Sequence, residues 1–273
     1  MSNPNKLGKV YLVGAGPGAA DLITVRGAKL LAKADIVFHD ALVEPEMLAL
    51  CPQAQLVLVG KRCGKLSSAQ HFINKRLIDA AKQYQIVVRL KGGDPMMFGR
   101  ADEEIQALKD HHIEVEVVPG ITAALAGAAA IQQSLTLRGV SRSVAFITLA
   151  QGVDNTPNPE DQYQPLPNPS ADTLVYYMGR KDASQIAKQL IEAGLKHQAS
   201  TPVHILEAVS TPRERHWTST LGELVLGNAD QWFEGSSPAL IMIGEALREK
   251  CSSTQVNDSL QDCKILTDSR RSA

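Results

Sequence analysis

Two glycine-rich turns, each directly after an apolar strand pattern, have the clearest chemical use in this sequence. The first turn is GAGPG (14–18), after the strand pattern of residues 10–13. The second is GGDP (92–95), after the strand pattern of residues 86–91. Glycines at the carboxyl end of a buried strand let a ligand approach the backbone, because no side chain stands in the way. Two such turns, each followed by a helical pattern, predict one ligand held by two loops.

Each turn leaves alternatives open. Gly14 and Gly16 match the start of the dinucleotide motif GxGxxG, but position 19 is alanine and Pro17 has no backbone N–H to donate. Nicotinamide binding is therefore disfavoured. In the second turn, Asp94 could cap the turn through its own side chain, or it could accept a hydrogen bond from a ribose hydroxyl.

Charged residues also follow predicted strands. Asp40 ends the strand pattern of residues 35–40 and could face the ligand or be a solvated loop residue. Basic residues that could line one cleft and bind carboxylates are Lys61, Arg62, Lys65, Arg89, Lys91, Arg100, Arg138 and Arg142. The seven histidines and four cysteines show no metal-ligand spacing, so we expect no metal site and reduced cysteines.

Composition bounds the class of protein. The chain has 273 residues, 44% of them hydrophobic, and a formal net charge of −1, which gives no global attraction to nucleic acid or to an anionic membrane. No apolar run approaches the roughly 20 residues that span a bilayer, and residues 1–9 are polar. These features predict a cytoplasmic protein with no membrane or nucleic-acid partner.

Periodicity places the turns on an α/β fold of two domains. In residues 1–118, strand and helix patterns alternate, which predicts a mainly parallel sheet. The predicted helices are 22–34, with Asp21 or Thr24 as N-cap, 69–83 and 101–111; the strands are 10–13, 35–40, 55–60, 86–91 and 113–118.

Pro119-Gly120 is a natural joint to a second α/β domain over residues 119–248. Residues 151–172 contain five prolines and are expected to form a mobile excursion or lid, and residues 249–273 a polar, disordered tail. The remaining predicted elements are helices 121–132 and 183–193 and strands 143–149, 173–178, 203–207, 214–218 and 239–244.

Taken together, these motifs resemble the uroporphyrinogen-III C-methyltransferases, within the tetrapyrrole methylase family. The matching stretches run in order from residue 10 to about residue 245, and few other families combine them. The most specific are GAGPG (14–18), VVRLKGGDPMMFGR (87–100), EVVPGITAA (116–124), LVYYMGR (174–180) and PALIMIGE (238–245).

The resemblance implies two α/β domains, commonly in a homodimer, with S-adenosylmethionine in the cleft between them and no metal. The implied reaction methylates uroporphyrinogen III at C2 and C7 to give precorrin-2 and S-adenosylhomocysteine. Residues carried over to the methyl donor are Pro17, Gly92, Gly93, Asp94, Met97, Thr122, Ala123, Met178 and Ala239. Asp40 and Lys61 take the acid–base positions, while Arg100, Glu103 and Arg138 face the tetrapyrrole.

The departures from the family pattern fall mainly on the acceptor side, at Ala41, Leu66 and Leu137; a further one, Val209, lies near the second-domain wall of the cofactor site. Two alternatives therefore stay open: a methyltransferase acting on a later precorrin, and a non-catalytic paralogue that binds the donor or a tetrapyrrole. The sequence does not decide whether the product leads to sirohaem, cobalamin or haem d1, or which group is the final base.

Overall fold

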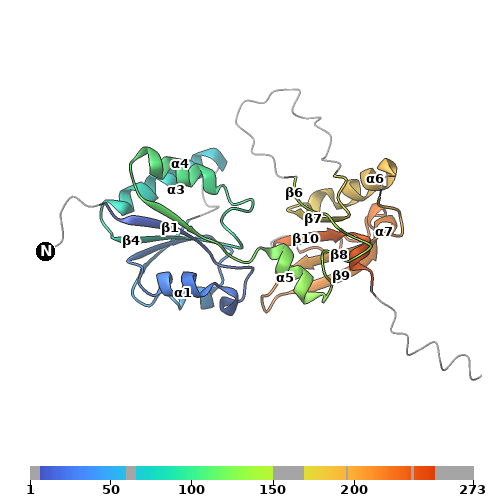
Figure 1. Ribbon diagram of the computed structural model, residues 1–273, viewed down its shortest axis with the longest axis horizontal. Helices are drawn as coiled ribbons and strands as arrows, with labels where there is room; N and C mark the ends of the chain where they lie inside the picture. Colours follow the sequence, from blue (N-terminus) through green and yellow to red (C-terminus); the bar gives the residue numbers. More distant parts are fainter. Residues whose placement is uncertain (1–6, 60–65, 150–168, 195, 235–236, 250–273) are drawn as a thin grey trace, which may run out of the picture.

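The computed structural model describes residues 7–59, 66–149, 169–194, 196–234 and 237–249, which form two five-stranded β-sheets joined by residues 119–122 (Figure 1). The first sheet has the order β3-β2-β4-β1-β5, and all of its strands run parallel, as the alternating pattern predicts. Its strands are β1 (Lys9–Gly14), β2 (Ile36–His39), β3 (Gln55–Leu58), β4 (Ile86–Lys91) and β5 (Val115–Val118).

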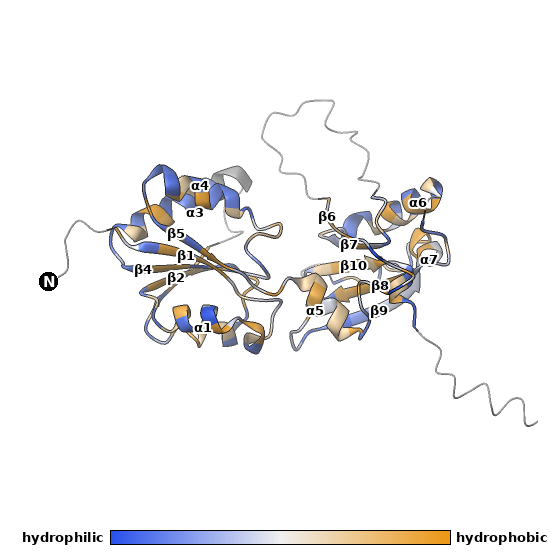
Figure 2. Ribbon diagram, in the orientation of Figure 1, coloured by the Kyte–Doolittle hydropathy of each residue, from blue (hydrophilic) through white to orange (hydrophobic). Residues whose placement is uncertain are grey.

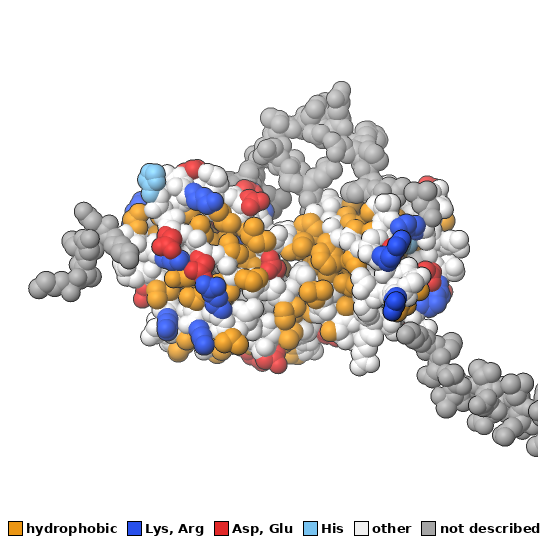
Figure 3. All heavy atoms as spheres, in the orientation of Figure 1, with side chains coloured by type: hydrophobic (Ala, Val, Ile, Leu, Met, Phe, Trp, Pro, Cys, Tyr) orange, Lys and Arg blue, Asp and Glu red, His pale blue; other side chains and the backbone are white. Residues whose placement is uncertain are grey.

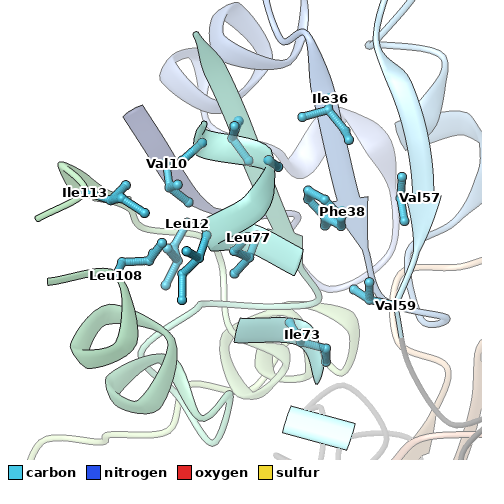
Figure 4. Packing of buried hydrophobic residues seen from close by; sticks show 14 of the residues in the cluster. Val10, Leu12, Ile36, Phe38, Val57, Val59, Ile73, Leu77, Leu108 and Ile113 are labelled. Atoms are coloured by element: carbon cyan, nitrogen blue, oxygen red, sulfur yellow. The ribbon is translucent and has the colours of Figure 1, made fainter. Parts of the chain in front are cut away.

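Helices cover both faces of the first sheet (Figure 1). Helix α1 (Val25–Leu31) and the short α2 (Pro45–Leu48) pack on one face, where Val13, Val37, Val88 and Leu90 meet Leu31 and Met47. Helices α3 (Leu66–Ala81) and α4 (Ala101–Asp110) pack on the other. Figure 4 shows this second core, in which strand residues such as Leu12 and Phe38 pack with Leu77 and Leu108.

Helix α1 begins at Thr24, one of the two predicted N-caps. Its hydroxyl accepts a hydrogen bond from the Gly27 N–H at 3.1 Å, which satisfies one of the free donors of the first turn. The helix is shorter than predicted. Residues Ala20–Leu22 form a separate 3₁₀ turn, and the extended backbone of Ile23 divides the two.

The second sheet has the order β6-β7-β10-β8-β9 and is mixed. Strands β6 and β7 are parallel, and the other neighbours are antiparallel, including the predicted hairpin of β8 with β9. Its strands are β6 (Val144–Thr148), β7 (Thr173–Tyr177), β8 (Pro202–Glu207), β9 (Arg215–Thr220) and β10 (Ala239–Ile243).

Small residues let helix α5 (Ala123–Ala130) lie close to one face of this sheet. A Cβ added at Gly127 would stand 3.2 Å from Met242 Sδ, so a larger residue would push the helix outward. Helices α6 (Ala183–Ala193) and α7 (Leu221–Val225) cover the opposite face. Figure 2 shows hydrophobic colour along β7, β8 and β10, which are buried between these helices. Helix α7 was not predicted, although Thr220 caps it through its side chain.

Several predictions fall outside the described residues. These are most of the proline-rich stretch 151–172, the tail 249–273 apart from its first residue, and Lys61. Among the helices that the structure describes, none is long and apolar enough to cross a membrane.

A buried histidine should make the stability of the fold depend on pH. His197 is 4% exposed, its Nε2 lies 3.1 Å from the Ala171 carbonyl oxygen, and burial lowers its pKa below the usual 6.5. The folded state therefore disfavours the protonated imidazole, whereas the unfolded chain takes up the proton near pH 6.5. We expect the melting temperature to fall as the pH is lowered below about 6.5, with a slope of at most about 1.4 kcal/mol per pH unit from this group.

The measurement is a series of thermal melts between pH 7.5 and 5.5. His197→Gln should flatten the slope, while the matched change at the exposed His71 should leave it as in the parent protein. An unchanged slope in His197→Gln would contradict the expectation.

Candidate active site

The two glycine turns lie side by side because β1 and β4 are neighbouring parallel strands. Gly14 stands opposite Lys91 at the carboxyl end of this pair. Beyond the strands, the Gly16 N–H donates to the Gly93 carbonyl oxygen at 3.1 Å, and the Gly93 N–H donates to the Gly16 oxygen at 2.7 Å. The two turns therefore form one continuous surface, consistent with a single ligand held by both.

Close backbone packing explains two of the glycines at this edge. A Cβ on Gly14 would lie 2.6 Å from the Gly120 Cα, and a Cβ on Gly120 would lie 2.3 Å from the Gly93 carbonyl oxygen. No side chain fits at such distances. Gly14 and Gly120 thus serve to bring the joint between the sheets against the two turns.

Gly92 has no such reason to be glycine. Its φ lies outside the left-handed region, and an added Cβ would meet one atom within 4 Å, the Leu42 Cβ at 3.7 Å, an ordinary contact. Gly93 has a φ of 67° and also faces open space, with the Thr122 Cα at 4.0 Å. The turn is therefore a cradle that Cβ atoms would fill, as expected where a ligand contacts the backbone.

Asp94 caps its own turn and fixes the joint. Its Oδ1 accepts from the Met96 N–H and its Oδ2 from the Gly120 N–H, both at 2.8 Å. The Met97 N–H donates to the Asp94 carbonyl oxygen at 3.2 Å, which closes the turn. The capping interpretation is confirmed. Each carboxylate oxygen retains a lone pair, so contact with a ribose stays a prediction.

The second sheet meets this edge through Tyr177, at the end of β7. Its hydroxyl lies 2.6 Å from Thr122 Oγ1 and accepts from the Ala124 N–H at 3.1 Å. Burial raises the pKa of this hydroxyl, so it stays neutral. The bonds hold Thr122 and the start of α5 against the end of β7. Tyr177 was not predicted as a site residue, although it directly precedes Met178.

Removing this hydroxyl should weaken both the fold and the site. In Tyr177→Phe the Ala124 N–H loses its partner, which should cost about 1–3 kcal/mol of stability and loosen the start of α5. We expect a lower melting temperature and weaker binding of S-adenosylhomocysteine by calorimetry. Tyr84→Phe, which removes an exposed bond to Gln55, is the matched control. Equal effects of the two changes would contradict this role.

Left-handed backbone is frequent at the same edge. Phe98, Arg100, Met178, Ala208 and Ser210 all have φ between 48° and 58°, a conformation that costs energy for residues with a Cβ. Such strain concentrates at functional sites. Met96, Phe98 and Met178 are also among the exposed large hydrophobic residues, and Figure 3 shows hydrophobic side chains gathered where the two units meet.

The loop after β8 reaches the first glycine turn. Ser210 Oγ accepts from the Ala19 N–H at 3.1 Å, and a Cβ on Gly18 would lie 2.5 Å from the Thr211 Cγ2. Pro17 is therefore half-buried between the two units, while Ala239 begins β10 opposite Glu207. Residues from both sheets thus surround the predicted donor site.

The residues expected to face the tetrapyrrole are only partly brought together. Arg100 and Glu103 form a two-bond ion pair at the start of α4, with Nε–Oε1 2.6 Å and Nη2–Oε2 2.7 Å. Arg100 also lines a cavity of about 210 Å³, together with residues 95, 96, 98, 99, 101 and 102. Arg138 lies in a different, exposed turn closed by Leu137 and Ser141.

Asp40 is held rather than freely solvated. Its Oδ1 accepts from Arg89 Nη2 at 2.5 Å, and its side chain is 30% exposed. Lys61, its predicted partner, lies outside the described residues. No group of three His, Cys, Asp or Glu side chains that could hold a metal occurs within the described ranges.

Two α/β units, with glycine turns of the first sheet against strand ends of the second, define the fold of the class III tetrapyrrole methyltransferases. The chain belongs to the Tetrapyrrole (Corrin/Porphyrin) Methylases, whose family model matches residues 9–225.

Three relatives illustrate the likeness. The chain is 44% identical over 242 residues to a uroporphyrinogen-III C-methyltransferase of Pseudomonas aeruginosa, covering 89% of this chain and 95% of the relative. It is 41% identical over 249 residues to a siroheme synthase of Psychrobacter, covering 91% of this chain but half of that longer protein. A crystal structure of uroporphyrin-III C-methyl transferase from Thermus thermophilus, complexed with S-adenyl homocysteine, matches with a TM-score of 0.70 and 37% identity, over 88% of this chain and 99% of that one.

Proposed function

We propose that this chain transfers methyl groups from S-adenosylmethionine to C2 and C7 of uroporphyrinogen III and so forms precorrin-2. The observation that carries the proposal is the pair of hydrogen-bonded glycine turns with its open cradle at Gly92 and Gly93. The likeness to the Pseudomonas aeruginosa enzyme, over nearly all of both chains, supports the substrate.

Residues of both sheets would hold the donor. Gly92 and Gly93 offer close backbone approach, Thr122, Ala123 and Met178 border the cradle, and Pro17, Asp94, Met97 and Ala239 complete it. S-adenosylmethionine supplies an electrophilic methyl group on a sulfonium, and its positive charge is favoured beside backbone carbonyls and a carboxylate. The residues therefore need chiefly to align the donor and exclude water, and the proposal involves no metal.

Asp40 would take part in acid–base chemistry with Lys61. Its other oxygen lies at the carboxyl edge of β2. When a pyrrole carbon attacks the sulfonium methyl, that carbon becomes quaternary, so the macrocycle must finally lose a proton from another ring position. The eight carboxylates of the acceptor would meet basic groups, among them Arg100, paired with Glu103, and Arg138.

The test is incubation of the protein with uroporphyrinogen III and isotopically labelled donor, followed by mass spectrometry. Transfer of two methyl groups is expected, and Asp40→Asn should reduce turnover. Transfer to a later precorrin alone would favour the second methyltransferase function. Donor binding without transfer to either acceptor would favour a non-catalytic paralogue.

We also propose that the chain acts in the cytoplasm as a homodimer, with domains over residues 1–118 and 119–248. Leu125 on α5 and Val140 are 53% and 47% exposed, and both are apolar side chains that a partner subunit would cover. Light scattering after gel filtration checks the dimer, and a monomeric mass at micromolar concentration would contradict it.

A further inference from the structure

Four charged side chains form a cluster on one side of the first sheet, beside the site. Arg89 and Lys91 are alternate residues of β4, so both point to the face covered by α3 and α4. Each is 3% exposed, and Glu104 on α4 is fully buried. Asp40 completes the cluster at the end of β2. Such residues are almost never buried unless they are paired.

Glu104 is the centre of this charge cluster. Its Oε1 accepts from Arg89 Nε, Lys91 Nζ and Gln70 Nε2, each at 3.1 Å. The other end of the same guanidinium donates from Nη2 to Asp40 Oδ1 at 2.5 Å. Arg89 therefore bridges the two carboxylates, and its rigid planar fork fixes the direction of Asp40 relative to Glu104.

The charges balance, with two positive and two negative groups. Burial lowers the pKa of Lys91, as does the charge of Arg89, and the carboxylate of Glu104 opposes both. A buried network of this kind adds little stability compared with well-packed hydrophobic residues. Its position is more informative. The cluster connects three elements: the end of β2, strand β4, which leads into the Gly92 turn, and helix α4, at whose start Arg100 and Glu103 lie.

We propose that Glu104 is a positioning residue that holds Asp40 in its reactive orientation through Arg89. One Asp40 oxygen is committed to Arg89, which leaves the other for the acceptor. Glu104 directly follows Glu103 on α4, so the same helix carries the positioning residue and the exposed Arg100–Glu103 pair. This inference rests on the proposed catalytic role of Asp40.

The experiment is a double-mutant cycle with Glu104→Gln and Asp40→Asn, measured as kcat and KM for methyl transfer. Glu104→Gln should lower kcat about 100-fold, the scale of a catalytic group misplaced by about 1 Å, with the donor KM within about twofold of the parent. Because Glu104 acts through Asp40, the double variant should be no slower than the slower single variant. A merely structural role would give multiplying losses instead.

Each outcome separates the inference from the proposed function. If Asp40→Asn is slow and the losses multiply, the positioning role is overturned while the function stands. If Asp40→Asn keeps full turnover, the catalytic role of Asp40 and the inference both fail. Absence of transfer by the parent protein overturns the proposed function itself and the inference with it.

Two further variants guard against loss of folding. Asp110→Asn neutralises an exposed carboxylate on the same helix and should leave kcat unchanged. If Glu104→Gln no longer binds S-adenosylhomocysteine, the cycle is run with Arg89→Lys. This change keeps the charge but cannot bridge both carboxylates, so it should show the same non-additive loss with Asp40→Asn.

Discussion

Gly92→Ala is expected to weaken the binding of S-adenosylhomocysteine about 10- to 100-fold and to leave the melting temperature nearly unchanged. The fold has room for the methyl group, since its closest neighbour would be the Leu42 Cβ at 3.7 Å. The proposed donor has no such room, and forcing one extra methyl into a packed contact costs about 1–3 kcal/mol, or about one to two decades in affinity. Calorimetric titration and a thermal melt together measure both quantities.

An unchanged affinity for S-adenosylhomocysteine would indicate that the donor does not contact this turn. A result in which affinity and stability fall together would indicate that the cradle is packed by the protein itself. Neither is expected from the open space beside Gly92 and Gly93.

Gly120→Ala, unlike Gly92→Ala, should destabilise the fold, by about 3 kcal/mol or more. Its Cβ would lie 2.3 Å from the Gly93 carbonyl oxygen and 2.8 Å from the Gly14 Cα, and these backbone atoms cannot turn aside as a side chain can. We expect a clear drop in the melting temperature with a loss of donor binding that follows from the displaced turn. A melting temperature within 1–2 °C of the parent, against a shift of several degrees expected for this cost, would contradict the packing role.

The sequence predicted the first sheet well because its signals are local. Short apolar strands, helical periodicity and the Thr24 cap each act within a few residues, and the alternation of strands with helices implies a mainly parallel sheet. Helix α7 was missed because five residues carry too little periodicity. Contacts between residues that are distant in the sequence could not be predicted either. Tyr177 is 55 residues from Thr122, and no sequence pattern near either residue indicates that their side chains form a hydrogen bond.

The charge cluster shows the same limit. Arg89 and Lys91 were recognised as basic residues that could bind the substrate, yet the structure turns both away from solvent and toward Glu104. Only the alternation of β4 and the packing of α4 decide this direction. Of the residues implied by the family resemblance, Arg138 lies in a separate turn and Lys61 lies outside the described residues, and the contacts of all of them with donor and acceptor stay predictions.

The bond from Asp94 to the Gly120 N–H has a mechanical consequence. It ties the peptide segment 119–122, which joins the two sheets, to the turn that would hold the donor. Rotation of one unit against the other would have to occur at residues after Gly120 or break this bond. A ligand bound on the Gly92 turn would lie beside this joint. Binding of the donor would therefore also restrict the angle between the two units, and with it the space in which the acceptor binds.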